Sequence, residues 1–271
     1  MYKSLLVVKL GGSVITDKES FVPRPRLKIV GQLTKDIATI YKKKRHKIIL
    51  VHGAGSFGHP IVKKYGLHKG MNSEAQKLAY SQTLQNMIEL NSIVIQNLIK
   101  LGVPAVSLPP HAFTIHTKSR LTKLDSKIIE IYLKNGQVPV LFGDAVLDEE
   151  WGCSILSGDT IVSYFARRLK AKKVVFLSDV DGIFNNDPKT NPNAKLIPLI
   201  NNKNLPSVLE SLRANSSRSE RADVTGEVYG KILSIKKDLK GIETVIANGL
   251  GLNSLTDALQ NRGRLTRFYF G

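Results

Sequence analysis

The stretch "KIILVHGAGSFGHP", residues 47–60, joins an apolar run to a loop with three glycines and two histidines. A short apolar run rich in branched side chains and bounded by glycine is typical of a buried strand. Glycine lacks a Cβ atom, so a loop rich in it can turn sharply and bring backbone N–H groups close to an anion. The stretch therefore predicts a buried strand that ends in an anion-binding loop.

Similar apolar runs alternate with amphipathic patterns along the chain. The runs predict strands over residues 5–10, 47–51, 104–108, 138–142, 173–178 and 243–248. The amphipathic patterns predict helices over about 24–44, 73–101, 124–135, 158–170 and 227–240. This alternation is typical of βαβ units around a mainly parallel sheet. No internal repeat or linker interrupts it, so we expect an α/β fold of three layers, αβα, in one domain spanning residues 1–271.

Polar loops follow several of the predicted strands. They are "GGSVITDK" (11–18), "HGAGSFGH" (52–59), "GDAVLDEE" (143–150) and "SDVDGIFNNDPK" (178–189). In open α/β sheets, ligands bind at the carboxyl ends of the strands. We therefore expect these loops to form the binding site.

The chain is strongly basic, with 40 Lys and Arg against 22 Asp and Glu and a formal net charge of +18. Such a charge suits nucleic acid, an acidic membrane surface or a phosphorylated small molecule. The basic clusters "YKKKRHK" (41–47), "ARRLKAKK" (166–173) and "SIKKDLKG" (234–241) lie at helix ends or at turns into strands. We interpret them as a solvated cationic surface and expect no specific nucleic-acid partner, because RNP strings, zinc-ligand spacings and helix-turn-helix patterns are not evident.

The cysteine content and hydropathy indicate a cytoplasmic protein. The only cysteine, Cys153, cannot form an intramolecular disulfide, which fits a reducing compartment. No apolar run approaches the roughly 20 residues that a membrane-spanning helix needs. The apolar run near the first residue is too short for a signal peptide.

The two glycine loops do not match the common nucleotide-binding patterns. Neither contains GxxxxGK[ST], and neither fits GxGxxG with its downstream acidic residue. Both follow predicted neighbouring strands, so they would emerge at the same sheet edge and could hold two facing anions. The sequence therefore indicates a different fold that handles phosphates.

Five motifs, in order, carry a resemblance to a known family. They are "VVKLGGSVITDK" (7–18), "VHGAGSFGHP" (51–60), "LSGDT" (156–160), "LSDVDGIFNNDP" (177–188) and "DVTGEVYGK" (223–231). Together they resemble the amino acid kinase superfamily, and the pairing of "GGSVITDK" with "GSFGH" is most similar to isopentenyl phosphate kinases. The resemblance implies the amino acid kinase fold, ATP-dependent conversion of isopentenyl phosphate to isopentenyl diphosphate in the alternative mevalonate pathway, and a homodimer. It also implies that the amino-terminal part mainly binds the acceptor and the carboxy-terminal part mainly binds ATP.

The resemblance assigns the phosphates of ATP to the first loop. Lys9 would bridge the phosphates, and the N–H groups of Gly11, Gly12 and Ser13 would donate to the β and γ phosphates. Lys18 would stabilise the transferred group.

Further ATP contacts are implied by later motifs. Gly55 of the second loop and Asp179, Asp181 and Gly182 after the strand 173–178 would contact ATP or its ribose. Gly226 in a loop and Lys231 in the helix that follows would reach the ATP phosphates.

The segment "SGDT" predicts a helix start. Ser157 is the expected N-cap, and Gly158 and Asp159 fall in the first turn, where free N–H groups and the helix dipole favour an anion. The resemblance implies that Gly158 binds substrate and that Asp159 orients the active-site lysines.

The second loop would bind the acceptor. Ala54, Gly55 and Gly58 would let backbone amides approach the acceptor phosphate, and His59 would donate a ring N–H to it. In the predicted helix 73–101, the side chains with room for an apolar tail are Tyr80, Thr83, Leu84 and Met87.

The candidate residues suit phosphoryl transfer between two polyanions. Such a reaction needs positive charge and fixed donors more than a base, and a phosphate-monoester acceptor is already largely dianionic at pH 7. Mg²⁺ is expected to bind with ATP rather than at an all-protein metal site. Alternative acceptors are a phosphonate, as in the similar fosfomycin kinase, or a nucleoside monophosphate. A basic nucleic-acid binding protein is the alternative from another class.

Overall fold

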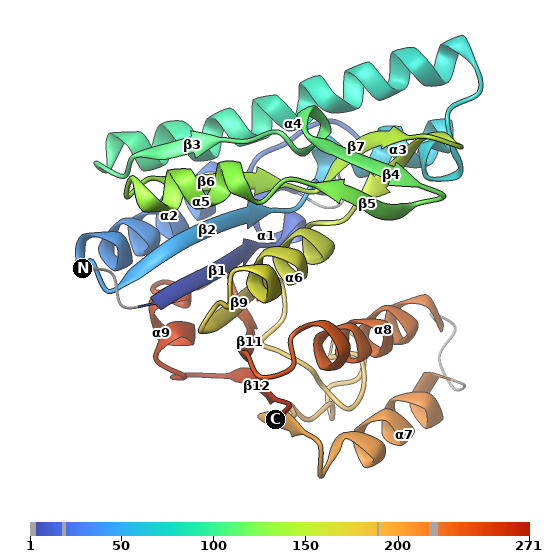
Figure 1. The fold of residues 1–271 in the computed structure, drawn as a ribbon. Coiled ribbons are helices and arrows are strands. Elements are labelled where there is room, and N and C mark those ends of the chain that lie inside the picture. Colours follow the sequence, from blue (N-terminus) through green and yellow to red (C-terminus); the bar gives the residue numbers. More distant parts are fainter. Residues whose placement is uncertain (1–3, 18–19, 189, 217–221) are drawn as a thin grey trace.

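Most of the chain is described by the structure, a computed structural model: residues 4–17, 20–188, 190–216 and 222–271, with the backbone alone for 214–216 and 222–227. The described part builds an eight-stranded sheet with the order β10-β12-β11-β9-β1-β2-β6-β3 (Figure 1). Every pair of neighbours in it is parallel except β11 and β12. The predicted mainly parallel sheet is therefore confirmed.

The six predicted strands all form and are consecutive in this sheet, from β11 to the edge strand β3. They are β1 (Ser4–Leu10), β2 (His46–His52), β3 (Ala105–Ser107), β6 (Val138–Phe142), β9 (Lys173–Ser178) and β11 (Glu243–Asn248). Two strands at one edge were not predicted: β10 (Leu199–Asn201) and β12 (Leu265–Tyr269). β10 has only three residues, too short a run to give a clear pattern.

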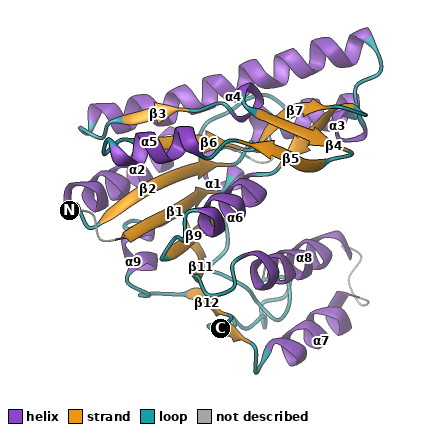
Figure 2. Ribbon diagram, viewed as in Figure 1, coloured by secondary structure: helices purple, strands orange, loops and turns teal. Residues whose placement is uncertain are grey.

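Helices cover both faces of the sheet and make the three predicted layers (Figure 2). Side chains alternate between the faces along each strand. One core contains residues from α1 (Gly12–Ile15), α2 (Leu27–Lys42), α4 (Glu74–Lys100) and α9 (Ser254–Leu259). The other core contains residues from α5 (Lys127–Lys134), α6 (Gly158–Arg168), α7 (Leu205–Ser216) and α8 (Ala222–Asp238). The short α3 (His59–Tyr65) follows the second glycine loop.

A second sheet has the order β5-β4-β7-β8. Its strands are β4 (Thr114–Thr117), β5 (Arg120–Leu124), β7 (Asp144–Asp148) and β8 (Gly152–Leu156). The prediction that 143–150 is a loop is therefore wrong, since most of it is β7. The two aspartates that made this segment look like a loop are both buried and accept backbone N–H groups, Asp144 from His111 and Ala145, and Asp148 from the turns described below.

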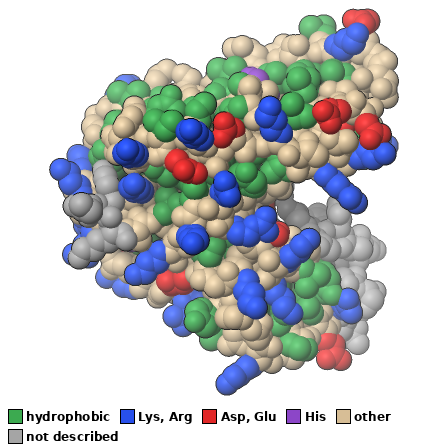
Figure 3. Space-filling model, viewed as in Figure 1, with side chains coloured by type: hydrophobic (Ala, Val, Ile, Leu, Met, Phe, Trp, Pro, Cys, Tyr) green, Lys and Arg blue, Asp and Glu red, His purple; other side chains and the backbone are tan. Residues whose placement is uncertain are grey.

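Lys and Arg side chains are spread over the face of the molecule in Figure 3, with fewer acidic side chains between them. The basic clusters lie, as predicted, at helix ends and at turns into strands. Within the described residues, no helix is both long enough and apolar enough to cross a membrane.

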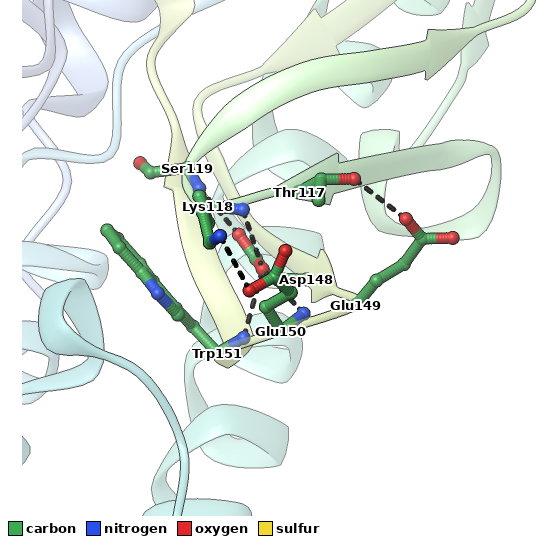
Figure 4. A network of polar contacts seen from close by, with 7 residues as sticks. All are labelled: Thr117, Lys118, Ser119, Asp148, Glu149, Glu150 and Trp151. Atoms are coloured by element: carbon green, nitrogen blue, oxygen red, sulfur yellow. Dashed lines mark hydrogen bonds and ion pairs between the residues drawn. The ribbon is translucent and has the colours of Figure 1, made fainter.

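Asp148 joins the two turns at one end of the small sheet (Figure 4). Its carboxylate accepts N–H groups from Lys118 at 3.1 Å and Ser119 at 2.7 Å, in the turn between β4 and β5. It also accepts N–H groups from Glu150 at 3.1 Å and Trp151 at 3.0 Å, between β7 and β8. Lys118 and Ser119 have φ of 49° and 59°, a left-handed conformation that costs energy for residues with a Cβ atom. Asp148 therefore stabilises a turn that the sequence alone disfavours.

Replacing Asp148 by Asn is expected to lower the free energy of unfolding by about 1–3 kcal/mol at pH 7, because four backbone N–H groups lose a charged, buried acceptor. Burial alone would raise the pKa of Asp148, but the N–H groups of Ser119, Trp151 and Glu150 outweigh it and lower the pKa to about 2. A lowered pKa stabilises the fold above the unfolded value of about 3.9, and this stabilisation is lost as the pH falls toward 2. The difference between wild type and variant should therefore narrow from pH 5 to pH 3 in urea titrations.

Glu149→Gln is the matched control. Its carboxylate accepts one bond, at 2.7 Å from the Thr117 hydroxyl, and the side chain is exposed. A change within about 0.5 kcal/mol is expected for such a surface site. Equal destabilisation by the two variants would contradict the role of Asp148.

Candidate active site

The two glycine loops lie in contact at the carboxyl ends of β1 and β2. These strands pair in parallel, with Lys9 beside Val51 and Leu10 beside His52. The Gly53 N–H donates to the Leu10 carbonyl at 2.9 Å and fixes the start of the second loop against the first. The prediction that both loops emerge at one sheet edge is confirmed.

Glycine is required where the loops touch. A Cβ atom on Gly12 would lie 2.5 Å from the Gly55 nitrogen, and one on Gly53 would lie 2.5 Å from the Gly12 nitrogen. Gly55 also has a φ of +51°, in the left-handed region. A side chain at any of these positions would separate the loops, so the glycines place two backbone segments side by side as well as allowing sharp turns.

The first loop is a one-turn helix, α1, that begins after Gly11. The Gly11 N–H donates to the Leu177 carbonyl at 2.9 Å, so this donor is engaged with the strand β9, and a contact between Gly11 and ATP stays a prediction. Within the described part of the chain, the N–H groups of Gly12 and Ser13 have no hydrogen-bond acceptor. The Ser13 hydroxyl donates to the Asp179 carboxylate at 3.1 Å, which brings the loops after β1 and β9 together.

Two residues that the sequence did not single out hold the glycine loops together. The buried Thr16 hydroxyl accepts the Ser56 N–H at 3.0 Å and donates to the Gly12 carbonyl at 2.8 Å. The Ser56 hydroxyl accepts the Arg24 N–H at 3.1 Å. Small hydroxyl residues within a glycine-rich loop give no separate sequence signal, since Thr16 and Ser56 lie 40 positions apart and Ser56 and Arg24 lie 32 positions apart.

Asp159 lies between two lysines that come from distant parts of the chain. Its Oδ1 accepts a hydrogen bond from the Lys9 ammonium at the end of β1. Its Oδ2 lies 3.7 Å from Nζ of Lys231 in α8. The Lys231 ammonium also lies 4.9 Å from the centre of the Phe176 ring, a cation–π distance. The carboxylate therefore brings both ammonium groups to one place.

The start of α6 positions Asp159 as predicted. The Ser157 hydroxyl caps the helix by accepting the Thr160 N–H at 3.1 Å, and Gly158 and Asp159 form the first turn. A Cβ atom on Gly158 would lie 3.2 Å from Cε of Lys9, so glycine leaves room for that side chain. Burial would raise the pKa of Asp159, but the charges of Lys9 and Lys231 outweigh it and lower the pKa to about 2. Asp159 is therefore ionised at neutral pH.

A pocket of about 240 Å³ opens beside this group between α6 and α8. Its lining includes Asp159, Lys231 and Phe176, together with the hydroxyl residues Thr160 and Ser163. An anion that enters here would meet the first turn of α6 and the Lys231 ammonium.

The loop after β9 is held to its neighbours by the predicted residues. Asp181 accepts hydrogen bonds from Asn248 Nδ2 at 3.1 Å and from Arg264 Nε at 2.7 Å. Gly182 packs against Thr266, where a Cβ atom would lie 2.5 Å from the hydroxyl. Both residues thus fix the loop to β11 and β12.

The acceptor residues of the second loop adjoin α4. A Cβ atom on Gly58 would lie 2.8 Å from that of Ala54 and 3.5 Å from the Met87 sulfur. His59 is the first residue of α3 and is exposed. Of the expected tail-pocket residues, Thr83 and Met87 are buried, whereas Tyr80 and Leu84 are half-buried. The side of α4 that carries Met87 therefore faces the loop near Gly58.

The other histidine of this loop, His52, belongs to the core. It is fully buried, stacks on Phe142 and lies 3.2 Å from the Asn91 side chain. Burial lowers its pKa to about 4, so it is neutral at pH 7.

Two predicted residues need separate mention. Lys18 lies outside the described residues. Gly226 was expected in a loop, but the backbone places it within α8, which begins at Ala222 and carries Lys231 further along.

Comparison with known proteins gives a consistent result. Residues 4–248 match the model of the amino acid kinase family. The chain is 34% identical over 262 residues to an isopentenyl phosphate kinase from Methanothermobacter thermautotrophicus, covering 94% of this chain and 95% of that protein. It is also 34% identical over 265 residues to an isopentenyl phosphate kinase from Methanocaldococcus jannaschii, with 94% and 95% covered.

A solved structure agrees with these relatives. The product complex of the T. acidophilum isopentenyl phosphate kinase superposes with a TM-score of 0.74 at 28% identity and covers 98% of this chain and 100% of that one. The sheet order, the paired glycine loops and these matches have one interpretation: the chain belongs to the amino acid kinase family.

Proposed function

We propose that this protein transfers the γ-phosphoryl group of ATP to isopentenyl phosphate, giving isopentenyl diphosphate and ADP. The observation that carries the proposal is Asp159, ionised and in contact with Lys9 and Lys231, beside two glycine loops. Similarity to isopentenyl phosphate kinases over 94% of the chain supports the choice of acceptor.

The arrangement suits the charge changes of phosphoryl transfer. Negative charge is spread over the transferred group and the leaving oxygen in the transition state, so catalysis depends on positioned positive charge. Lys9 and Lys231 supply two ammonium groups, and Asp159 keeps them in place without being protonated at neutral pH. A dianionic acceptor phosphate is its own nucleophile and needs no general base. We propose that Lys18 contributes a further positive charge.

Mg²⁺ is expected to enter with ATP and to neutralise charge on its phosphates. Asp159 is already engaged by two ammonium groups, and Asp179 accepts the Ser13 hydroxyl. No group of three or more metal-binding side chains occurs within the described residues. The ion would therefore be held mainly by phosphate oxygens and water, as Mg²⁺ commonly is.

The acceptor would bind between the second glycine loop and α4. Backbone groups near Ala54, Gly55 and Gly58 would face its phosphate, with the His59 ring as a side-chain donor. The apolar tail would lie along the α4 face that carries Tyr80, Leu84 and Met87. This division assigns the acceptor to the amino-terminal part and ATP to the carboxy-terminal part of a single domain. We further propose a cytoplasmic homodimer that acts in the alternative mevalonate pathway.

Purified protein with ATP, Mg²⁺ and isopentenyl phosphate should release ADP and form isopentenyl diphosphate, identified by mass. Turnover with fosfomycin and UMP in parallel reactions should be slower, because one lacks the apolar tail and the other carries a base. Faster turnover with another acceptor would reject the isoprenoid assignment and keep phosphoryl transfer. No transfer to any of them would reject both.

Asp159→Asn should lower kcat at least about 100-fold, because the two ammonium groups lose the charge that positions them where transition-state charge develops. Initial rates over a range of ATP concentrations, with thermal unfolding as the folding check, measure the effect. Asp238→Asn is the matched control: it lines the same pocket but pairs with Arg167 at 3.7 Å. Similar loss in both variants would contradict a specific role for Asp159.

His59→Ala should lower kcat/KM for isopentenyl phosphate about 10- to 100-fold, the cost of losing a hydrogen bond to a charged group. The KM for ATP should change less than twofold, since His59 is assigned to the acceptor. His68→Ala, another exposed histidine of the same segment, should leave both constants unchanged. Full activity of His59→Ala would remove that residue from the site.

A further inference from the structure

A second pocket lies at the opposite end of the large sheet from the glycine loops. It has a volume of about 270 Å³, and its lining includes His46, Lys173 and Glu243, the first residues of β2, β9 and β11. The glycine loops follow the last residues of such strands, and the seven residues of β2 span about 20 Å. The pocket is therefore separate from the candidate active site.

Two basic sequence clusters converge on this pocket. Lys43 and Arg45 come from "YKKKRHK", in the turn from α2 into β2, and Lys172 comes from "ARRLKAKK", in the turn from α6 into β9. Strand β1 pairs in parallel with both β2 and β9, so the turns that precede β2 and β9 lie at the same end of the large sheet, where the strands begin. Clusters more than 100 residues apart in the sequence thus line one small cavity.

The positive charge of the pocket is only partly compensated. Glu243 is its one acidic lining residue, and it is paired with the buried Lys173 at 3.0 Å. The Lys173 ammonium also donates hydrogen bonds to the Leu259 carbonyl at 2.9 Å and to Asn261 Oδ1 at 2.8 Å. Within the described part of the chain, Lys43, Arg45 and Lys172 have no carboxylate within 4 Å. Three exposed cations therefore remain around the cavity.

The pKa of the His46 ring is affected by this positive charge. It is half-buried at the pocket wall, and its Nδ1 lies 2.7 Å from the Ser4 hydroxyl. Burial lowers the pKa of His46, and the charges of Lys172, Arg45 and Lys173 lower it further. The field inside the pocket therefore disfavours another cation and favours an anion.

We propose that this pocket binds a small phosphorylated anion at a site distinct from the active site. Lys43, Arg45 and Lys172 would hold the phosphate oxygens, with charge-assisted hydrogen bonds from lysine and a planar fork from arginine. Ile40 and Leu259 line the same cavity and would contact an apolar group attached to the phosphate. A cavity of this volume admits a small molecule and not a polymer chain.

Inorganic diphosphate is the probe, added to the full-length protein with the active site saturated by a non-hydrolysable ATP analogue. Histidine ring signals are followed by NMR. The His46 signals should shift to saturation, and its pKa should rise by at least about half a unit, because a bound anion opposes the cations that lower it. If the His46 ring signals do not shift at diphosphate concentrations up to about 10 mM, a dissociation constant too weak for a specific site, the proposal is overturned.

Arg45→Ala/Lys172→Ala should weaken this binding at least about tenfold while leaving kinase activity unchanged, which also shows that the variant folds. Lys100→Ala/Lys134→Ala removes the same net charge from exposed positions outside the pocket and should bind diphosphate as the wild type does. Equal weakening in both variants would indicate a general charge effect and reject the site. Binding of single-stranded RNA but not diphosphate, lost in the Arg45/Lys172 variant, would replace it with a nucleic-acid surface.

Discussion

The candidate active site depends on the backbone contact between Gly12, Gly53 and Gly55. Each would place a Cβ atom within 3 Å of the other loop, so a side chain at any of them would separate the carboxyl ends of β1 and β2. The contact is reinforced by Thr16, whose hydroxyl links the Gly12 carbonyl to the Ser56 N–H. Because β1 carries Lys9 at this edge, the same contact sets the distance between the lysine and the second loop.

Asp159 adds the electrostatic constraint. A lysine at the end of a strand and another in a helix are flexible cations that repel each other, and the attraction of each to a carboxylate between them offsets that repulsion. Its place in the first turn of α6 also gives the carboxylate the favourable end of the helix dipole. Lys9 is mostly buried, with 16% of its side chain exposed, whereas 41% of the Asp159 side chain is exposed, so solvent reaches the pair from the Asp159 side. The result is a fixed positive region where two polyanions can approach.

The sequence predicted the elements that depend on local pattern. Buried runs such as 47–51 and 173–178 form strands because their apolar side chains must leave water on both faces of the sheet. The N-cap at Ser157 and the turn at Gly158 likewise rest on neighbouring residues. The segment 143–150 was misread because Asp144 and Asp148 look like loop residues until distant N–H donors are known. The hydrogen bond of the Gly11 N–H could not be predicted for the same reason, since its acceptor, the Leu177 carbonyl, is 166 positions away.

Cationic side chains gather at both ends of the large sheet, but they are paired with acidic groups differently at the two ends. At the carboxyl ends of the strands, Lys9 and Lys231 share one carboxylate, and their pairing holds them in a defined geometry. At the amino ends, Glu243 neutralises the buried Lys173, and the cations at the surface have no acidic partner in the described residues. Solubility alone does not require these cations to lie together, because cations scattered over the surface repel one another less. Gathering Lys43, Arg45 and Lys172 around one cavity costs repulsion, and a bound anion is the partner that would offset it.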